Sequence, residues 1–240
     1  MTSPSFDGRV AIVAGATGAL GRIVAREFVA GGASVGLLGS RLEGLTALAA
    51  ELDLPGDRWH AEEADLTDAA VARAAVDAIA ARFGALHVVV NAIGGYAGGT
   101  PVSEVDPAEI TGMLDQHLWT TFHLARASAP HLIHAGWGRI IGVSTPIAST
   151  PAAKMAPYAV GKAAQEALLM TLAKELAGTG VTVNVVQVRK IDKDHEREHT
   201  QPPKPAAGTT PEEIAAAILY LCSDEAGIVS GVRVPVFGGA

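Results

Sequence analysis

The sequence lacks several features that define other classes of protein. It contains one cysteine, Cys222, so no disulfide can form within the chain. Residues Met1–Gly8 show no basic segment followed by an apolar stretch, which a secretory signal would have. The apolar run Ile214–Cys222 is far shorter than the roughly 18–20 residues that cross a bilayer. These absences predict a cytoplasmic protein with no membrane partner.

Positive charge and aromatic residues are also scarce. The 240 residues include 18 Lys and Arg against 25 Asp and Glu, which gives a net charge of −7, and only 5% are aromatic. Proteins that bind nucleic acid usually present a basic surface, so nucleic acid is not an expected partner. Hydrophobic residues make up 49%, enough to form a core, and the length suits one large domain.

Short β-branched runs alternate with stretches of helical spacing along the chain. Residues 9–14 predict a strand buried on both faces, and 19–31 predict the helix that follows it. Further strands are expected at 34–38, 59–64, 86–90, 139–143, 181–188 and 232–237, and helices at 42–52, 68–83, 109–131, 158–177 and 211–223. Repeated βα units predict a single domain over 1–240, an α/β fold with a doubly wound parallel sheet and helices on both faces.

Helix start signals refine two of these helices. Thr67 or Asp68 can cap the helix at 68–83, on which Val71, Ala75, Ile79 and Phe83 are expected to share the apolar face. The helix at 211–223 opens with Thr210 and a proline in its first turn.

The segment 189–210 is charged and then proline-rich, which is typical of a mobile lid over a substrate. Within it, His195–His199 matches the HExxH pattern of zinc proteases. The flanking charges and the prolines at 202 and 203 do not suit the helix that this metal site needs, so no metal is expected.

A glycine-rich turn joins the first strand to the first helix. It reads Gly15-Ala16-Thr17-Gly18-Ala19-Leu20-Gly21, and such a turn lets backbone N–H groups approach a pyrophosphate at the positive end of a helix. The turn therefore predicts a dinucleotide site; tight packing of the turn is the alternative. After the second strand, Ser40 and Arg41 stand where an acid would select NAD. This favours NADP(H), with NAD(H) possible, although Arg41 can also be a solvated residue at a helix start.

Tyr158 and Lys162 are four residues apart, which places both on one face of a helix. A nearby ammonium favours the phenolate, so we expect Lys162 to lower the pKa of Tyr158 and to make it a proton-transfer group. The strand end at Ser144 and Thr145 supplies hydroxyl groups that can join this pair.

Taken together, these motifs resemble those of the short-chain dehydrogenase/reductase family, over nearly the whole chain. The resemblance rests on the glycine turn, the strand ends at Asp65-Leu66, Asn91-Ala92-Ile93-Gly94 and Ser144-Thr145, the pair Tyr158 and Lys162, and Gly238-Gly239. It implies a Rossmann-type fold and assigns Tyr158 as the general acid/base. Lys162 would hold the nicotinamide ribose. The cofactor residues implied are Gly15, Thr17, Gly18, Leu20, Gly21, Ser40, Arg41, Asp65, Leu66, Asn91, Ala92, Gly94, Tyr158 and Lys162.

The chain departs from the family pattern at four positions. Ala19 stands where the middle glycine is usual, although Gly15, Gly18 and Gly21 satisfy the spacing of atypical members. Thr145 replaces the catalytic serine and keeps its hydroxyl. His117 replaces the catalytic asparagine and can add a group that titrates near physiological pH; a packed histidine is the alternative. Val188-Arg189 replaces a Pro-Gly beside the nicotinamide, where Arg189 or Lys190 can meet an acidic substrate.

The sequence therefore predicts an NAD(P)-dependent oxidoreductase that moves a hydride between nicotinamide and a small carbonyl or secondary alcohol. Its expected catalytic residues are Tyr158, Lys162, Thr145 and His117. A lyase, cyclase or isomerase on the same scaffold, or a regulatory dinucleotide-binding protein, stays as an alternative. The resemblance also implies a homotetramer or a dimer through the fourth and fifth helices.

Overall fold

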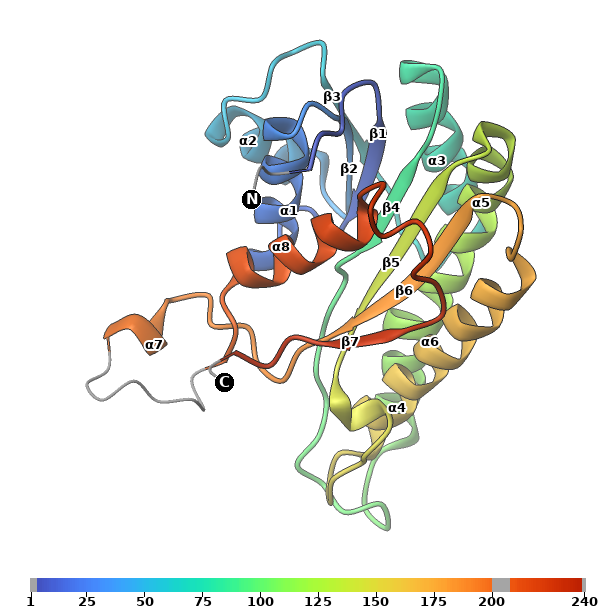
Figure 1. Cartoon of the computed structure of the whole chain (residues 1–240). Helices are drawn as coiled ribbons and strands as arrows, with labels where there is room; N and C mark the ends of the chain where they lie inside the picture. Colours follow the sequence, from blue (N-terminus) through green and yellow to red (C-terminus); the bar gives the residue numbers. More distant parts are fainter. Residues whose placement is uncertain (1–3, 200–207, 239–240) are drawn as a thin grey trace.

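A seven-stranded parallel sheet forms the centre of the molecule (Figure 1). The computed structural model describes residues 4–199 and 208–238, with the side chains at 198 and 199 left out. The strands are β1 (Val10–Ala14), β2 (Ser34–Gly39), β3 (Trp59–Glu63), β4 (Val88–Asn91), β5 (Gly138–Ser144), β6 (Val181–Gln187) and β7 (Arg233–Pro235). Their order is β3-β2-β1-β4-β5-β6-β7. The chain therefore adds β2 and β3 on one side of β1 and then crosses over to add β4 and the later strands on the other side, so the strand order reverses between β1 and β4. In such sheets a ligand binds at the carboxyl ends of the strands beside this reversal.

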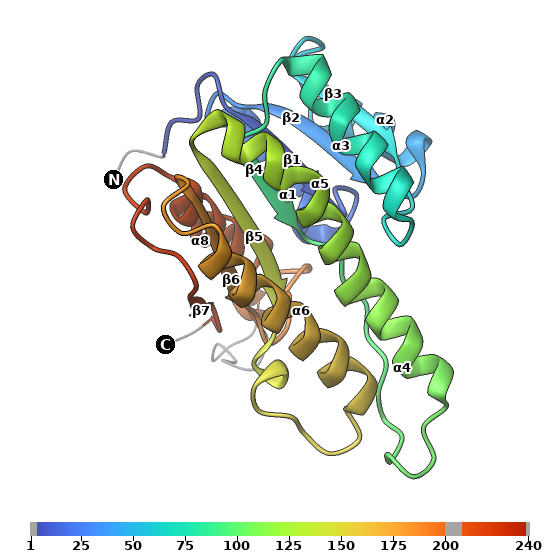
Figure 2. The same cartoon turned by 90° about the vertical axis from the view of Figure 1, so that its right-hand side faces the viewer.

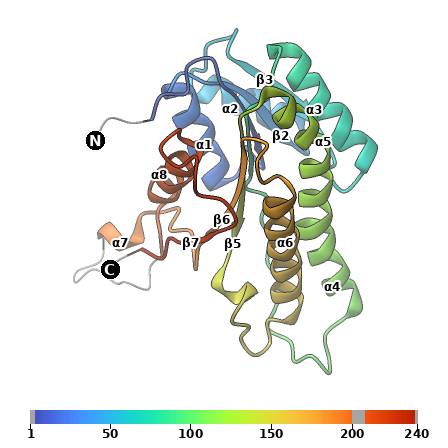
Figure 3. The ribbon, with the colours of Figure 1, turned by 45° about the vertical axis from the view of Figure 1, so that its right-hand side comes forward.

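Helices cover both faces of the sheet, as the sequence predicts. They are α1 (Ala19–Ala30), α2 (Leu42–Glu51), α3 (Ala69–Phe83), α4 (Pro107–Leu114), α5 (Thr120–Ala135), α6 (Ala156–Glu175), α7 (Glu196–His199) and α8 (Pro211–Cys222). Figure 3 shows α1 and α8 on one side and α3, α5 and α6 on the other. No helix in the described part of the chain is both long and apolar enough to cross a membrane.

Each face has its own hydrophobic core. On one, Phe28 of α1 and Ile218 of α8 pack against strand residues such as Val13. On the other, Ile79 of α3 and Leu169 of α6 pack against residues such as Ile12. Alternate side chains of β1 point to opposite faces, which is why its run of apolar residues is continuous.

The helix expected at 109–131 extends further at both ends, from Pro107 to Ala135, and contains one irregular turn (Figure 2). Asp106 caps its start, since Oδ1 accepts a hydrogen bond from the Ala108 N–H at 2.8 Å, and Gly136 ends it with a φ of 65°. Between α4 and α5, Asp115–Trp119 forms a π-helix turn. Such turns often occur at functional sites, and this one holds His117.

The cap of α3 is confirmed, but its expected apolar face is partly wrong. Asp68 Oδ1 accepts hydrogen bonds from the N–H groups of Ala70 and Val71. The residues that α3 buries are Ala72, Ala75, Val76, Ile79 and Ala80, whereas Val71 is 39% exposed. Ala75 and Ile79 thus lie on the buried face as expected, and Phe83 packs against that core while partly buried, but Val71 lies outside it. Thr210 caps α8 with a reciprocal bond to Glu213.

Candidate active site

A cavity of about 970 Å³ opens at the carboxyl ends of β1 to β4. Its volume lies within the range of cofactor sites. Eight of the expected cofactor residues line it: Gly15, Thr17, Gly18, Ser40, Asp65, Leu66, Ala92 and Gly94. The structure thus brings together motifs that lie far apart in the sequence.

The glycine turn at this cavity fits a pyrophosphate. Gly15 has a φ of +76°, and a Cβ on it would lie about 3 Å from the backbone of Ala92 and Ile93. A Cβ on Gly21 would lie 2.2 Å from the Gly15 carbonyl oxygen, so that position accepts only glycine. Gly18 begins α1, and within the described residues no side chain caps this helix and no acid lies in its first turn. The N–H groups of Gly15, Ala16 and Gly18 donate to backbone carbonyls, so the N–H groups available to an anion are those of the first turn of α1, Ala19–Gly21.

Three of the expected cofactor residues, Asp65, Leu20 and Asn91, are held by their surroundings in different ways. Asp65 Oδ1 accepts bonds from the N–H and hydroxyl of Thr67, and the hydroxyl bond is the main cause of its lowered pKa. Leu20 is buried, 3% exposed, and Asn91 is 3% exposed. The Asn91 amide accepts from the Ile93 N–H at 3.0 Å and donates to Thr121 Oγ1 at 2.8 Å. Asn91 thus shapes the turn after β4 instead of lining the cavity.

A second cavity of about 190 Å³ adjoins the first, because Thr17 and Ser40 line both. Arg41 lines it and is exposed. Arg22 of α1, which the sequence analysis did not single out, lines it too and forms an ion pair with Glu51. The Arg22 Nε atom is buried and has no partner among the described residues.

Tyr158 lies in the first turn of α6, and the side chain of Thr145 lies near enough to its hydroxyl to favour the phenolate. Thr145 is therefore the hydroxyl that reaches Tyr158, while Ser144 Oγ is buried without a partner in the described part of the chain. Burial raises the pKa of Tyr158 above its usual value, and the Thr145 side chain opposes this. The ring also meets those of Tyr96, at 5.4 Å between centroids, and His117, at 5.7 Å.

The expected effect of Lys162 on Tyr158 is wrong for this structure, because the pKa of Tyr158 is raised instead of lowered. Lys162 is 3% exposed, and its Nζ donates to the Val143 carbonyl at 2.8 Å and to Gln165 Oε1 at 3.0 Å. Burial lowers the pKa of Lys162 to about 7, against a weaker opposing effect of Glu166. The amine is thus held toward the end of β5, and burial dominates both pKa values.

His117 does not supply a group that titrates near neutral pH, which corrects that expectation. Burial, and then the charge of Lys162, lower its pKa to about 3. Its Nε2 lies 3.3 Å from the Gly95 carbonyl oxygen, and Nδ1 has no partner among the described residues. Its backbone carbonyl accepts a 2.6 Å bond from Thr121 Oγ1. His117 is thus a neutral ring packed beside Tyr158.

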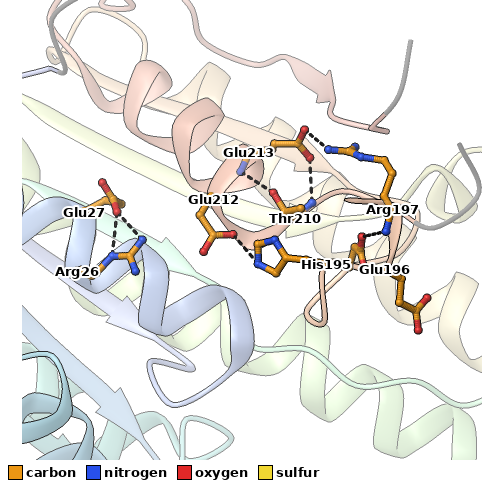
Figure 4. Close-up of polar contacts among 9 residues, drawn as sticks. Arg26, Glu27, His195, Glu196, Arg197, Thr210, Glu212 and Glu213 are labelled. Carbon is orange, nitrogen blue, oxygen red and sulfur yellow. Dashed lines mark hydrogen bonds and ion pairs between the residues drawn. The ribbon is translucent and has the colours of Figure 1, made fainter. Parts of the chain in front are cut away.

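The described part of the segment 189–210 is tied to α8 (Figure 4). His195 Nε2 lies 3.5 Å from Glu212 Oε2, and Arg197 pairs with Glu213. His195 precedes the four-residue helix α7, and no group of three possible metal ligands occurs among the described side chains. Residues 200–207, with both prolines, and Gly239 lie outside the described residues, and so do the side chains of Glu198 and His199.

The three residues after β6 each contact a different neighbouring group. Val188 is buried, with its N–H bonded to the Ser144 carbonyl, and the Arg189 guanidinium stacks 4.5 Å from the Phe237 ring. The exposed Lys190 Nζ lies 3.1 Å from Glu196 Oε2.

Sequence reasoning missed three residues besides Arg22: Tyr96, Thr121 and Gln165. Gln165 is fully buried and bonded to Lys162, and its place three residues after Lys162 was a signal that it shares a helix face with that lysine. Tyr96 and Thr121 carry no pattern of their own.

The comparisons with known proteins agree with this fold. The family profile described as short chain dehydrogenase matches residues 9–204. D-threitol dehydrogenase of Mycolicibacterium smegmatis is 30% identical over 245 residues, which cover 98% of this chain and 93% of that protein. The 3-oxoacyl-acyl-carrier-protein reductase FabG of Salmonella typhimurium is also 30% identical, over 98% of each chain.

Among solved structures, a short-chain type dehydrogenase/reductase from Mycobacterium ulcerans superposes with a TM-score of 0.87 at 28% identity, over 97% of this chain and 89% of that one. The chain therefore belongs to the short-chain dehydrogenase family and is an NAD(P)-dependent oxidoreductase of alcohols and carbonyls.

Proposed function

We propose that Tyr158 moves the proton while a hydride passes between the cofactor and the substrate carbon. The bound nicotinamide supplies or accepts the hydride. Because a tyrosine is protonated at neutral pH and burial raises the pKa of Tyr158 further, its phenol can donate its proton to the substrate oxygen during carbonyl reduction. Thr145, whose side chain lies beside Tyr158, can donate a hydrogen bond from its hydroxyl to the same oxygen. The Thr145–Tyr158 contact is the observation that carries this proposal.

Lys162 is proposed to stabilise negative charge as Tyr158 gives up its proton. Its amine lies one helical turn from Tyr158 and, with a pKa of about 7, is partly protonated at neutral pH. The neutral His117 ring can pack and form hydrogen bonds, but it cannot act as an imidazolium acid at neutral pH. This removes the main motive for a lyase or isomerase. The joint presence of Tyr158, Thr145 and Lys162 likewise favours an enzyme over a regulatory protein.

We propose that the cofactor is NADP(H). The cavity of about 190 Å³ beside Ser40 and Arg41 adjoins the larger one where the adenosine would lie, and two arginines line it. Arginine suits a phosphate group because its guanidinium donates paired hydrogen bonds. NAD(H) is the second candidate, because Glu51 and Glu63 also line these cavities and place negative charge there.

The test measures binding of NADPH and NADH, followed by turnover with a panel of small carbonyl compounds. Arg41→Ala is expected to weaken NADPH binding by about tenfold with little effect on NADH, since a hydrogen bond to a charged group contributes about 1.5–3 kcal/mol. Arg26→Ala is the matched control, because Arg26 pairs with Glu27 on α1 and lines neither cavity (Figure 4). Equal binding of both cofactors by the wild type would overturn the NADP preference, and no binding of either would overturn the function.

We also propose that the chain forms a homo-oligomer, a tetramer or a dimer, through α5 and α6. Exposed apolar side chains support this: Trp119 beside α5, Ile133 on α5 and Val160 on α6 are each more than 40% exposed. Light scattering of the wild type and of Val160→Asp tests it, and a monomeric wild type would contradict it.

Residues 189–210 stay the candidate substrate lid, and a cytoplasmic location, expected from the single cysteine, is testable by fractionation.

A further inference from the structure

Gln165 of α6 is fully buried beside Lys162. Its Oε1 accepts from Lys162 Nζ at 3.0 Å, and its Nε2 donates to Thr121 Oγ1 at 3.0 Å. A buried amide costs free energy unless both of its ends are bonded. Gln165 is thus fully engaged, and one of its two partners is a catalytic candidate.

The neighbours of Thr121 fix which way the Gln165 amide points. The Thr121 hydroxyl donates its one proton to the His117 carbonyl at 2.6 Å and accepts from Asn91 Nδ2 at 2.8 Å. Its remaining lone pair can only accept, so it requires the NH₂ end of Gln165. The carbonyl end of that amide must then face Lys162. A continuous chain of hydrogen bonds therefore joins the end of β4 to the amine of Lys162.

The charged groups around Lys162 leave a specific task to this amide. Glu166, which follows Gln165 on α6 and is 2% exposed, favours the charged form of Lys162 through its negative charge, but its carboxylate pairs with Arg233 of β7 and accepts from Gln187 Nε2 at 2.9 Å. His117 and Tyr158, which face the site from the π turn and α6, have pKa values that keep both neutral at neutral pH. Within the described residues, the direct acceptors of Lys162 Nζ are thus the Val143 carbonyl and Gln165 Oε1.

We propose that Gln165 is a positioning residue for the hydride-transfer reaction: its amide oxygen holds the Lys162 ammonium in its charged form and in a fixed place near Tyr158. Asn91 and Thr121 act through Gln165 by fixing the direction of its amide. The effect on catalysis rests on the proposed roles of Tyr158 and Lys162, but the effect on Lys162 itself does not.

The test compares Gln165→Met and Gln165→Glu. Methionine fills a similar volume without an acceptor, so it disfavours the ammonium and lowers the pKa of Lys162. Glutamate places a negative charge there and raises that pKa, and the Thr121 hydroxyl can turn to donate to the carboxylate only by giving up its bond to the His117 carbonyl. We expect shifts of about one pH unit in opposite directions, since a hydrogen bond to a charged group is worth about that much. Ser128→Ala, which removes a buried unpartnered hydroxyl on α5, is the control and leaves the titration unmoved.

Two readouts separate this proposal from the proposed function. NMR of protein labelled with ¹⁵N in the lysine side chains follows the Lys162 titration without substrate, with Lys162→Met assigning its signal. The pH profile of kcat/KM then shows whether the limb that reports Lys162 moves with that titration. A titration unmoved in both variants overturns the proposal. If the Lys162 titration shifts in the variants but the wild type turns over no carbonyl compound, the role of Gln165 toward Lys162 holds and only the proposed function is overturned. If Gln165→Met does not fold, Gln165→Glu, which preserves the side-chain size, decides the sign by itself.

Discussion

The proposed nucleotide site is built mainly from backbone, whereas the proposed catalytic site is built from buried side chains. At the first, Gly15, Gly18 and Gly21 clear space around a helix start. At the second, Lys162 and Gln165 are enclosed, and hydroxyl and amide groups satisfy them. A backbone site depends on the absence of side-chain atoms, so any added atom damages it. A buried polar site depends on matched partners, so an isosteric change can adjust its pKa while the fold is kept.

The largest expected effect is at the glycine turn. Gly21→Ala places a Cβ 2.2 Å from the Gly15 carbonyl oxygen, so the turn must move. We expect NADPH binding to be lost and the free energy of unfolding to fall by about 1–3 kcal/mol, as for other overpacked sites. Fluorescence titration and urea unfolding measure these. Gly56→Ala is the matched control, since its Cβ would meet nothing within 4 Å. Normal NADPH binding by Gly21→Ala would break the contrast between the two ends.

At the catalytic end, Thr145→Val removes the hydroxyl that meets Tyr158 but keeps the shape of the side chain. We expect kcat to fall by about 10²-fold, the effect of removing one donor to a developing charge, with unchanged NADPH binding. Thr145→Ser should retain most turnover, and Ser144→Ala should behave as the wild type because its hydroxyl contacts no partner in the described structure. A large loss of kcat in Ser144→Ala would instead assign to Ser144 the hydroxyl that bonds the substrate oxygen.

A smaller effect is expected in the pH dependence of stability. The pKa of Lys162 is about 7 in the folded protein, against 10.5 for an ordinary lysine. Between these values the unfolded chain binds more protons, so the contribution of Lys162 to the free energy of unfolding rises with pH. The free energy of unfolding of the wild type minus that of Lys162→Met should therefore be constant below about pH 7 and should rise between about pH 7 and pH 10.5. Urea unfolding at a series of pH values measures it, and a difference that is flat throughout would contradict the burial of a titrating amine.

The same contrast explains what the sequence could predict. The alternation of strands and helices and the glycine turn follow from local patterns, since each depends on residues close in the chain. The choice of Thr145 as the hydroxyl beside Tyr158 rests on the family resemblance. The raised pKa of Tyr158 and the neutral His117 do not, because burial decides them. The bond between Thr121 and Gln165 joins residues 44 positions apart and leaves no periodic signal. Sequence reasoning thus named the groups that are proposed to react, but not the burial and contacts that set their charge.

The most direct test of the central claim compares two neighbouring phenols. The rings of Tyr96 and Tyr158 lie 5.4 Å apart, yet Tyr158 contacts Thr145, whereas the Tyr96 hydroxyl donates to Met155 Sδ. With NADPH and a carbonyl compound that the wild type reduces, Tyr158→Phe should lower kcat by about 10²–10⁴-fold and keep NADPH binding, while Tyr96→Phe should retain turnover. Full turnover in Tyr158→Phe, or an equal loss in both variants, would contradict the assignment of Tyr158 as the proton donor.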